Sequence, residues 1–252
     1  MKVTVLGCGT SFGVPMIACK CPVCTSTDPR NKRTRSSILV NEAGKNILID
    51  TTTDLRAQAI ANGIERIDAV LYTHPHAEHI HGIDELRRFN WLQAESIPCY
   101  GSPETLRLIR ETFKYIFVNP GKPGWQPNLT ANDIEGPFEV FGIKVVPIEL
   151  MHGDLPIFGY RFGDFAYLTD FSEIPEESEE LLKGVRVAVV EALRHDPHPT
   201  HVNLEQALEV IARLKLERAA LTHMAHGFDY ETMMETLPDG VELGYDGLVL
   251  EI

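Results

Sequence analysis

Three histidines and one carboxylate fall within one short segment of the sequence, at His74, His76, Glu78 and His79. Imidazole and carboxylate together suit zinc, manganese or iron. The segment follows the apolar run Ala69–Tyr72, which predicts a strand. Alternate residues of an extended segment face the same way, so His74 and His76 can hold one ion, and a turn can bring Glu78 and His79 to a second. A solvated, histidine-rich surface loop is the alternative, which this spacing after a strand disfavours.

Three further residues of metal-binding type each follow a predicted strand. His152 comes after a strand that ends at Leu150, Asp170 after a hairpin, and His223 after Ala219–Leu221. Taken singly, each is as readily structural, since Asp170 could cap a turn and His152 could satisfy a backbone group. Ligands usually gather at strand ends in α/β folds, so we expect these residues to meet the first cluster at one sheet edge.

Cysteines form a second group with metal-binding spacing. The chain has five cysteines, an odd number that speaks against a disulfide framework where no signal peptide is recognisable. Three of them, Cys19, Cys21 and Cys24, crowd into one segment. Structural zinc takes four ligands in a closed tetrahedron, and His226 could be the fourth. Free thiols on a flexible loop are the alternative.

The acidic balance of the chain bears on its partners. Its 252 residues carry 36 acidic and 23 basic side chains, a net charge of −13 at pH 7. Nucleic-acid binding draws most of its affinity from basic side chains, so a nucleic-acid partner is not expected. The start, Met1–Leu6, predicts a strand and not a signal peptide, and no apolar run is long enough to cross a bilayer. We therefore expect a cytoplasmic protein with a small-molecule partner and no membrane partner.

The elements that must position these side chains are strands with helices between them. The predicted strands are Lys2–Leu6, Ser37–Val40, Asn46–Asp50, Ala69–Tyr72, two within Phe138–Ile148, Tyr160–Phe162, Ala166–Leu168, Val185–Val190 and Ala219–Leu221. The predicted helices are Asp54–Ala61, Ile83–Leu92, Glu104–Ile116 and Leu204–Leu214. Residues 11–34 are expected to be irregular, and residues 117–136 to form a loop that could act as a lid. The pattern predicts two sheets covered by helices.

These motifs resemble the metallo-β-lactamase superfamily, in which a His-x-His-x-Asp-His motif combines with a later His, a bridging Asp and a final His. The likeness runs from the Gly7-Cys8-Gly9-Thr10-Ser11 segment through Asp50 to His223. It implies an α/β fold of the αββα four-layer sandwich type, with residues 1–252 as a single domain. A zinc loop rich in cysteine would lie at about residues 16–34.

The resemblance also implies a ligand set for two divalent metals, zinc or manganese, with iron as a further option. One metal would be held by His74, His76 and His152, the other by Glu78, His79 and His223, with Asp170 bridging both. Glu78 stands where the superfamily usually has Asp. Its extra methylene moves the carboxylate by about 1 Å or more, which could weaken or displace the second metal.

The Cys-rich insertion and the second histidine after the last metal histidine resemble the PhnP-type phosphodiesterases of phosphonate breakdown. This likeness implies a structural zinc on Cys19, Cys21, Cys24 and His226. It also implies a phosphodiesterase for small cyclic or diester phosphates, such as a ribosyl cyclic phosphate, with a hydroxide bridging the two metals as nucleophile. A homodimer is a further expectation from this likeness.

Catalytic roles are expected for three residues: Asp170 and Glu78 at the metals, and His201. By the same resemblance, His201 would act as general acid or phosphate ligand, with His195 and His198 as nearby competitors. We also expect Asp50 to orient a metal-binding histidine, or else to make a structural hydrogen bond. His81 is expected beside the ligands or at the surface.

Four other functions remain open at this stage. A ribonuclease Z-like nuclease is disfavoured by the short, acidic chain and by Glu78. A lactonase or thioesterase is compatible with the same metal core, which alone does not choose phosphorus over carbon. A non-hydrolytic cofactor-biosynthesis protein resembling PqqB would share the Cys-rich loop.

Overall fold

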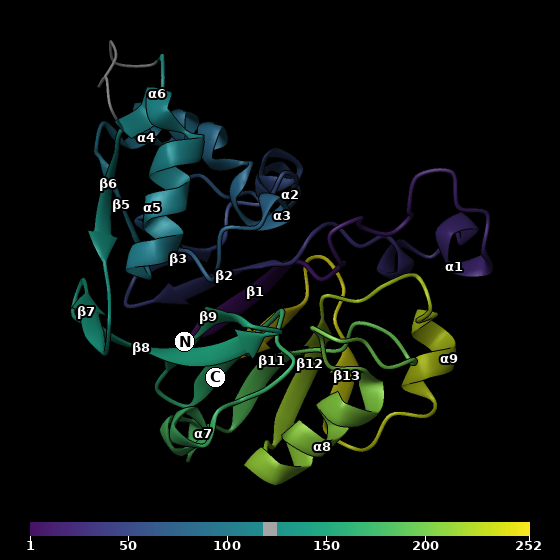
Figure 1. Ribbon diagram of the computed structural model, residues 1–252. Coiled ribbons are helices and arrows are strands. Elements are labelled where there is room, and N and C mark those ends of the chain that lie inside the picture. Colours follow the sequence, from purple (N-terminus) through teal and green to yellow (C-terminus); the bar gives the residue numbers. More distant parts are fainter. Residues whose placement is uncertain (118–124) are drawn as a thin grey trace.

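Two seven-stranded sheets face each other in the computed structural model, which describes residues 1–117 and 125–252. Helices cover the outer faces of both sheets, so the chain forms an αββα sandwich (Figure 1). Because each strand of such a sandwich buries one face against the other sheet and one against helices, the central strands are apolar on both faces. The predicted fold class is confirmed.

The first sheet has parallel strands on the side that carries the histidine motif. Its order is β14 (Val249–Glu251), β1 (Lys2–Gly7), β2 (Ser37–Glu42), β3 (Lys45–Ile49), β4 (Ala69–Leu71), β5 (Ile97–Gly101) and β6 (Leu129–Asp133). Strands β3 to β6 pair in parallel, so their carboxyl ends lie at one edge. Asp50 follows β3 and the histidine motif follows β4 at this edge.

The second sheet brings its own strand ends to the centre. Its order is β13 (Val241–Leu243), β12 (Arg218–Thr222), β11 (Val187–Glu191), β10 (Phe165–Leu168), β9 (Leu155–Phe162), β8 (Ile143–His152) and β7 (Phe138–Val140). Strands β10 to β13 are parallel, and β8 runs in the same direction because β9 is antiparallel to both neighbours. The ends of β8, β10, β11 and β12 therefore share one edge.

The helices of the described chain are mostly short. They are α1 (Pro22–Thr25), α2 (Leu55–Ala61), α3 (Ala77–Ile80), α4 (Leu86–Gln93), α5 (Pro103–Thr112), α6 (Lys114–Phe117), α7 (Glu176–Leu182), α8 (Leu204–Leu214) and α9 (Tyr230–Met234), with 3₁₀ turns at Pro29–Asn31 and Ile83–Glu85. Helix α8 begins where Asn203 and Gln206 form a reciprocal capping box. It buries Ala207, Val210 and Ile211, spaced to share one helical face.

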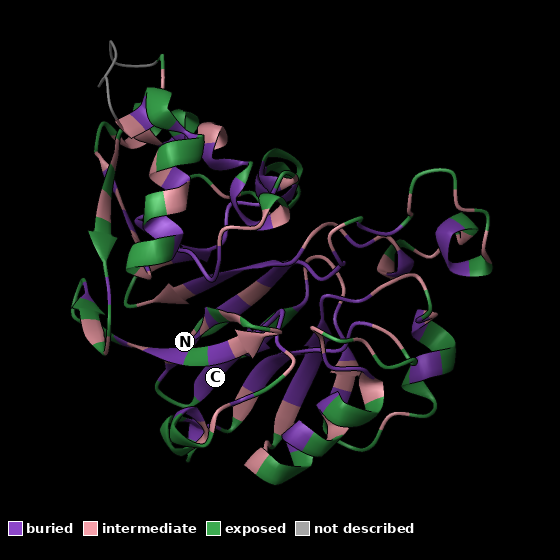
Figure 2. Cartoon of the chain, viewed as in Figure 1, coloured by how far each residue is buried: buried purple, intermediate pink, exposed green. Residues whose placement is uncertain are grey.

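Apolar side chains form two main cores. One lies between the sheets and reaches α8, and the other lies between the first sheet and helices α2, α4 and α5. Figure 2 shows the central strands almost wholly buried and the outer helix faces exposed. The strand ends that carry the site therefore project from a close-packed framework. Among the described residues, no helix has both the length and the apolar character to cross a membrane.

Several element predictions need correction. Residues 117–136 contain strand β6, and residues 11–34 contain the short helix α1. The predicted strand Val185–Val190 begins at Val187, and β8 extends as far as His152. The helix predicted over Ile83–Leu92 opens with a 3₁₀ turn. Part of the proposed lid, residues 118–124, lies outside the described part of the chain.

Candidate metal centre

The two sheets bring seven predicted ligands together at their shared edge. Glu78, His79, Asp170 and His223 each place one ligand atom within 4.8 Å of the others. Asp170 Oδ2 lies 3.1 Å from His223 Nε2 and 3.4 Å from His79 Nε2. Residues almost 150 positions apart in the chain thus meet because β4, β10 and β12 end at the same edge. This group coincides with the predicted second ligand set.

The predicted first ligand set lies beside this group. The ring centroids of His74, His76 and His152 are 4.5, 5.1 and 5.8 Å apart. His74 Nε2 is 3.8 Å from Asp170 Oδ2, so Asp170 lies between the two sets as a bridging ligand would. His152 is the last residue of β8, and not one that follows the strand.

Three histidines have an oxygen within hydrogen-bond reach of Nδ1, and in a fourth, His223, Nδ1 faces an oxygen without a hydrogen bond. His152 Nδ1 donates to the Thr200 carbonyl at 2.9 Å, and His79 Nδ1 donates to Asp50 Oδ2 at 2.7 Å. His74 Nδ1 is 3.0 Å from Thr73 Oγ1, which itself donates to Asp50 Oδ2 at 2.8 Å. His223 Nδ1 lies 3.2 Å from Glu191 Oε1. The hydrogen bonds at His152, His79 and His74 fix these three rings with Nε2 available as a ligand.

The atoms turned toward the centre have no hydrogen-bond partner of their own. Within the described residues this holds for the buried Nε2 atoms of His74, His79 and His223 and for Asp170 Oδ2. The three Nε2 atoms lie 3.1 to 3.8 Å from Asp170 Oδ2. A buried polar atom without a partner is destabilising, whereas a divalent cation would satisfy all four. The donor set therefore fits a metal.

Burial and neighbouring charges shift the pKa values of the clustered residues in different directions. Burial alone would raise the pKa of Asp170, but His223 and His79 hold that pKa well below its usual range. Burial would lower the pKa of His79, yet Asp170 and Asp50 outweigh it and raise that pKa well above normal. Burial lowers the pKa of His74 well below normal, and His79 adds to the effect. The pKa values of the adjacent His74 and His79 are thus shifted in opposite directions. Bound cations would remove this conflict.

The backbone at this edge is also unusual. Asp50, Asp170 and His223 have φ values of 65°, 58° and 55°, in the left-handed region that non-glycine residues rarely adopt. All three lie just after parallel strands. Such conformations concentrate at functional sites, where the surrounding structure holds a side chain in a required direction.

Glu191 is a site residue that the sequence prediction missed. It ends β11, is fully buried, and accepts a hydrogen bond from the Phe171 amide at 2.5 Å. Its Oε1 accepts from His201 Nδ1 and lies near His223 Nδ1. The His201 side chain is 12% exposed, and its ring is 4.6 Å from that of His152. Glu191 therefore holds His201 at the mouth of the cluster.

The competing histidines lie farther from the ligands. His198 Nδ1 accepts from the Thr200 amide at 3.3 Å, and its ring is 5.0 Å from that of His201. His195 is exposed and packs on Phe228. His81 is exposed against Phe113, so it is at the surface as one of the two expectations had it.

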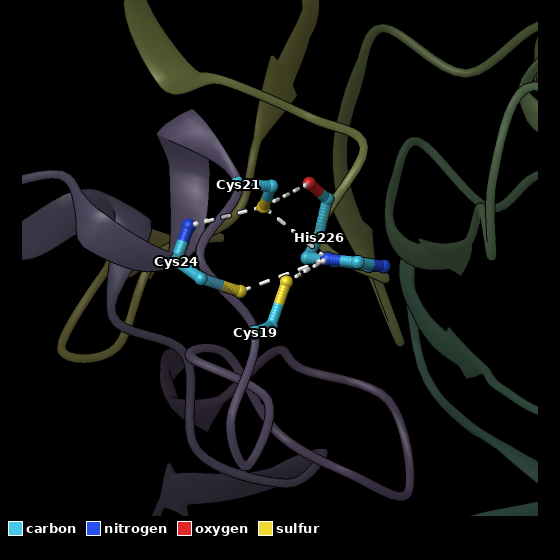
Figure 3. A group of neighbouring side chains, drawn as sticks. All are labelled: Cys19, Cys21, Cys24 and His226. Atoms are coloured by element: carbon cyan, nitrogen blue, oxygen red, sulfur yellow. Dashed lines mark hydrogen bonds between the residues drawn. The ribbon is translucent and has the colours of Figure 1, made fainter.

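The predicted zinc residues form a second compact cluster. Figure 3 shows Cys19, Cys21 and Cys24 turned toward His226. Their Sγ atoms lie 3.2, 3.3 and 3.6 Å from His226 Nδ1. Three thiols and one imidazole within 4.8 Å of one another match the donor set of a closed structural zinc site.

The thiols of this cluster differ in acidity. A hydrogen bond from the Cys24 amide lowers the pKa of Cys21 to about 6. Burial raises the pKa of Cys24 to about 11. Met224, between His223 and His226, pairs with the N-terminal segment: its amide donates to the Cys8 carbonyl at 2.9 Å, and its carbonyl accepts from the Thr10 amide at 3.1 Å.

The fold and the site match those of a known superfamily. The model of the beta-lactamase superfamily domain matches residues 45–224, which include the histidine motif, Asp170 and His223. The chain belongs to this superfamily. Its fold implies divalent metals and a hydrolase, and the described residues supply candidate metal-binding groups.

Three proteins are similar to this chain within the superfamily or in fold. A crystal structure described as a new diphosphatase from the PhnP family is 42% identical, covers 100% of this chain and 97% of its own, and has a TM-score of 0.93. The octanoyltransferase of Porphyromonas gingivalis is 40% identical over 98% of this chain. The chain spans 51% of that protein, about half its length. Zinc-bound PqqB from Methylobacterium extorquens shares the fold, with 19% identity, a TM-score of 0.77 and full coverage of both chains. A superfamily member of PhnP type, as predicted, is confirmed.

Proposed function

We propose that this chain is a metal-dependent hydrolase that cleaves a phosphorus–oxygen bond in a small phosphodiester or diphosphate. The observation that carries the proposal is the 42% identity over the full chain to a structure described as a diphosphatase of the PhnP family. The two linkages share a phosphorus atom that carries a leaving oxygen and two negative or partly negative oxygens. The same cationic centre can therefore serve both.

The proposed ligands are those that the structure brings together. His74, His76 and His152 would hold one divalent ion, and Glu78, His79 and His223 the other, with Asp170 shared. Bound divalent ions would supply a nucleophilic water near neutral pH and neutralise charge on the phosphate oxygens. The carboxylate of Glu78 reaches the group despite its extra methylene, since one of its oxygens lies within 4.8 Å of ligand atoms of His79, Asp170 and His223.

His201 is the proposed general acid. It belongs to neither proposed ligand set, yet its ring adjoins those of His152 and His223, with centroids 4.6 and 5.1 Å away. Glu191 accepts from its Nδ1, which directs Nε2 away from that carboxylate. A proton at Nε2 can pass to the oxygen that leaves phosphorus, so the product departs as a neutral hydroxyl or a protonated phosphate.

We do not propose acyl transfer for this chain on its likeness to the octanoyltransferase of Porphyromonas gingivalis, because that protein is about twice as long. A nuclease is disfavoured by the net charge of −13. A zinc-binding protein without hydrolytic activity, in the manner considered for PqqB, would lack a use for the His201–Glu191 pair.

A substrate panel tests the proposal. The protein, loaded with manganese or zinc, is assayed with bis(p-nitrophenyl) phosphate, a ribosyl cyclic phosphate and a dinucleoside diphosphate, and with a lactone and a thioester in parallel. We expect turnover of at least one phosphorus substrate and no turnover of the carbon esters. Turnover of the lactone or thioester alone, or of no substrate with both metals bound, would overturn the proposal.

A further inference from the structure

A cavity of about 640 Å³ opens beside the histidine motif, between the end of the first sheet and α7. Its size is that of pockets that enclose small organic ligands. Prolines are prominent in its walls, namely Pro75, Pro103, Pro137, Pro147, Pro156 and Pro175. Proline offers neither a backbone donor nor a flexible side chain, so the proline-lined parts of the walls are rigid and apolar.

Three contacts join the cavity to the proposed metal ligands. Pro75, which lines it, stands between His74 and His76. Phe158, another lining residue, donates its amide to the Thr73 carbonyl at 3.0 Å. Leu155 also lines the cavity and pairs with His152 across the β8–β9 hairpin. The cavity therefore lies next to the residues that would hold the metals.

The charge around the cavity is one-sided. Its lining includes four exposed carboxylates, those of Glu104, Glu135, Glu149 and Glu177, and no lysine or arginine among the described residues. The other large cavity, of about 960 Å³ between α7 and α8, has Lys183, Arg213 and Lys215 among its acidic residues. A second anionic group would be repelled from the proline-lined cavity, whereas an uncharged one would not.

We propose that this cavity binds an apolar, uncharged substituent on the substrate's phosphate. The inference rests on the proposed function, because it places the reacting phosphate at the histidine cluster. The cavity contributes affinity by removing apolar surface from water. It also selects against substrates that place a negatively charged group inside this cavity.

Binding of simple phosphonates tests this without relying on turnover. Methyl-, butyl- and octylphosphonate, and an octylphosphonate with a terminal carboxylate, are titrated into the metal-loaded protein by calorimetry. We expect affinity to rise by about 4-fold for each buried methylene until the cavity is full. The terminal carboxylate is expected to abolish most of that gain.

A pair of leucine substitutions locates the effect. Leu181 lines the cavity and is 42% exposed, while Leu92 is 49% exposed on α4, away from it. Leu181→Lys is expected to weaken octylphosphonate by about 10-fold and to strengthen the carboxylated ligand, with methylphosphonate unchanged. Leu92→Lys is the matched control, for which no change is expected.

The outcomes separate the two proposals. Equal affinity for the methyl and octyl ligands, or equal effects of the two leucine variants, would overturn the apolar subsite. Failure of every phosphonate to bind would overturn both proposals. Chain-length dependence without any turnover of phosphorus substrates would leave the cavity proposal standing and contradict only the proposed reaction.

Discussion

At the scale of single residues, carboxylates behind the histidines organise the site. Asp50 holds His79 directly and His74 through Thr73. Glu191 plays the corresponding part for His201 from the other sheet, and its Oε1 also lies 3.2 Å from His223 Nδ1. Such partners fix the tautomer and direction of each ring, which a metal site or a proton donor requires. The sequence pattern that pointed to Asp50, a carboxylate ending a buried strand, applies equally to Glu191 and could have found it.

The proton-donor role of His201 gives the first prediction. His201→Ala is expected to lower kcat toward a substrate with a poor leaving group by about 10²- to 10⁴-fold, because that leaving oxygen must take up a proton. Metal content should stay at the wild-type value. The control is His81→Ala, since His81 is exposed and its ring packs against Phe113. Wild-type kcat in the His201 variant would remove the residue from the mechanism.

The unequal thiols predict how metal uptake depends on pH. Cys24, with its pKa raised to about 11, stays protonated below that pH and must release a proton on binding. Cys21, with its pKa lowered to about 6, is already a thiolate at pH 8 and adds a second released proton only below pH 6. Because both thiols bind metal as thiolates, we expect apparent affinity to rise with pH across this range, and most steeply below pH 6.

Cobalt makes this measurable at the cysteine cluster alone, because cobalt–thiolate absorption does not arise from the histidine ligands. Titrations followed by that band between pH 5.5 and 8.5 give the slope. An affinity that does not change with pH over this range would contradict the assignment of the thiols as ligands.

At the scale of elements, close packing sets the direction of the motif. The Gly82 amide donates to the Thr51 carbonyl at 2.9 Å just after α3. A Cβ at Gly82 would lie only 1.9 Å from the Thr52 carbonyl oxygen. Only glycine lets the turn that carries His79 approach the loop after β3 so closely.

Gly82→Ala is therefore expected to lower the free energy of unfolding by about 2–3 kcal/mol through overpacking. Gly136→Ala is the control, because a Cβ there meets no atom within 4 Å. Chemical denaturation of both variants measures the difference. Equal stability of the two proteins would show that the loop after β3 yields to the methyl group.

The cysteine loop gives a second prediction at this scale. Val14, Val23 and Cys24 form only a small apolar cluster, so the loop has little core of its own. Cys21→Ala is expected to abolish zinc at this site and to lower Tm by about 4–8 °C, equivalent to about 2 kcal/mol for a chain of this size. Lys20→Ala, an exposed neighbour, should change neither. Unchanged zinc content in the Cys21 variant would count against a metal there.

Which elements the sequence predicts depends on where their apolar residues fall. Helix α8 and the strands around it carry clear periodicity, and the prediction Leu204–Leu214 coincides with the observed helix. Strand β5 contains Pro98, which disfavours a strand, and was missed. Strand β6 is a largely polar edge strand, so it has no alternation to detect. In the site, the predicted ligands lie together. Glu191 could be found as a carboxylate that ends a strand, but its closeness to His223 depends on β11 and β12 being neighbours, which the sequence does not show.

At the scale of the whole molecule, the proposed metals would join the two sheets. The first sheet contributes His74, His76, Glu78 and His79, and the second contributes His152, Asp170 and His223. Ions bound only by the folded chain raise its stability through mass action, by about 4 kcal/mol at a free concentration 1,000 times the dissociation constant. A chelator such as EDTA is therefore expected to lower Tm by about 8–16 °C, and added manganese or zinc to reverse the loss. If chelation left Tm unchanged, metal binding at this site would not stabilise the folded chain.

The most direct test is to titrate metal-stripped protein with manganese while recording both bound ions and hydrolysis of bis(p-nitrophenyl) phosphate, for wild type and for Asp170→Ala. The proposed two-metal mechanism predicts that wild-type activity rises as two ions bind outside the cysteine cluster. It also predicts that the variant binds fewer ions and stays inactive. Activity that appears without metal, or a wild-type protein whose histidine cluster takes up no ion, would contradict it.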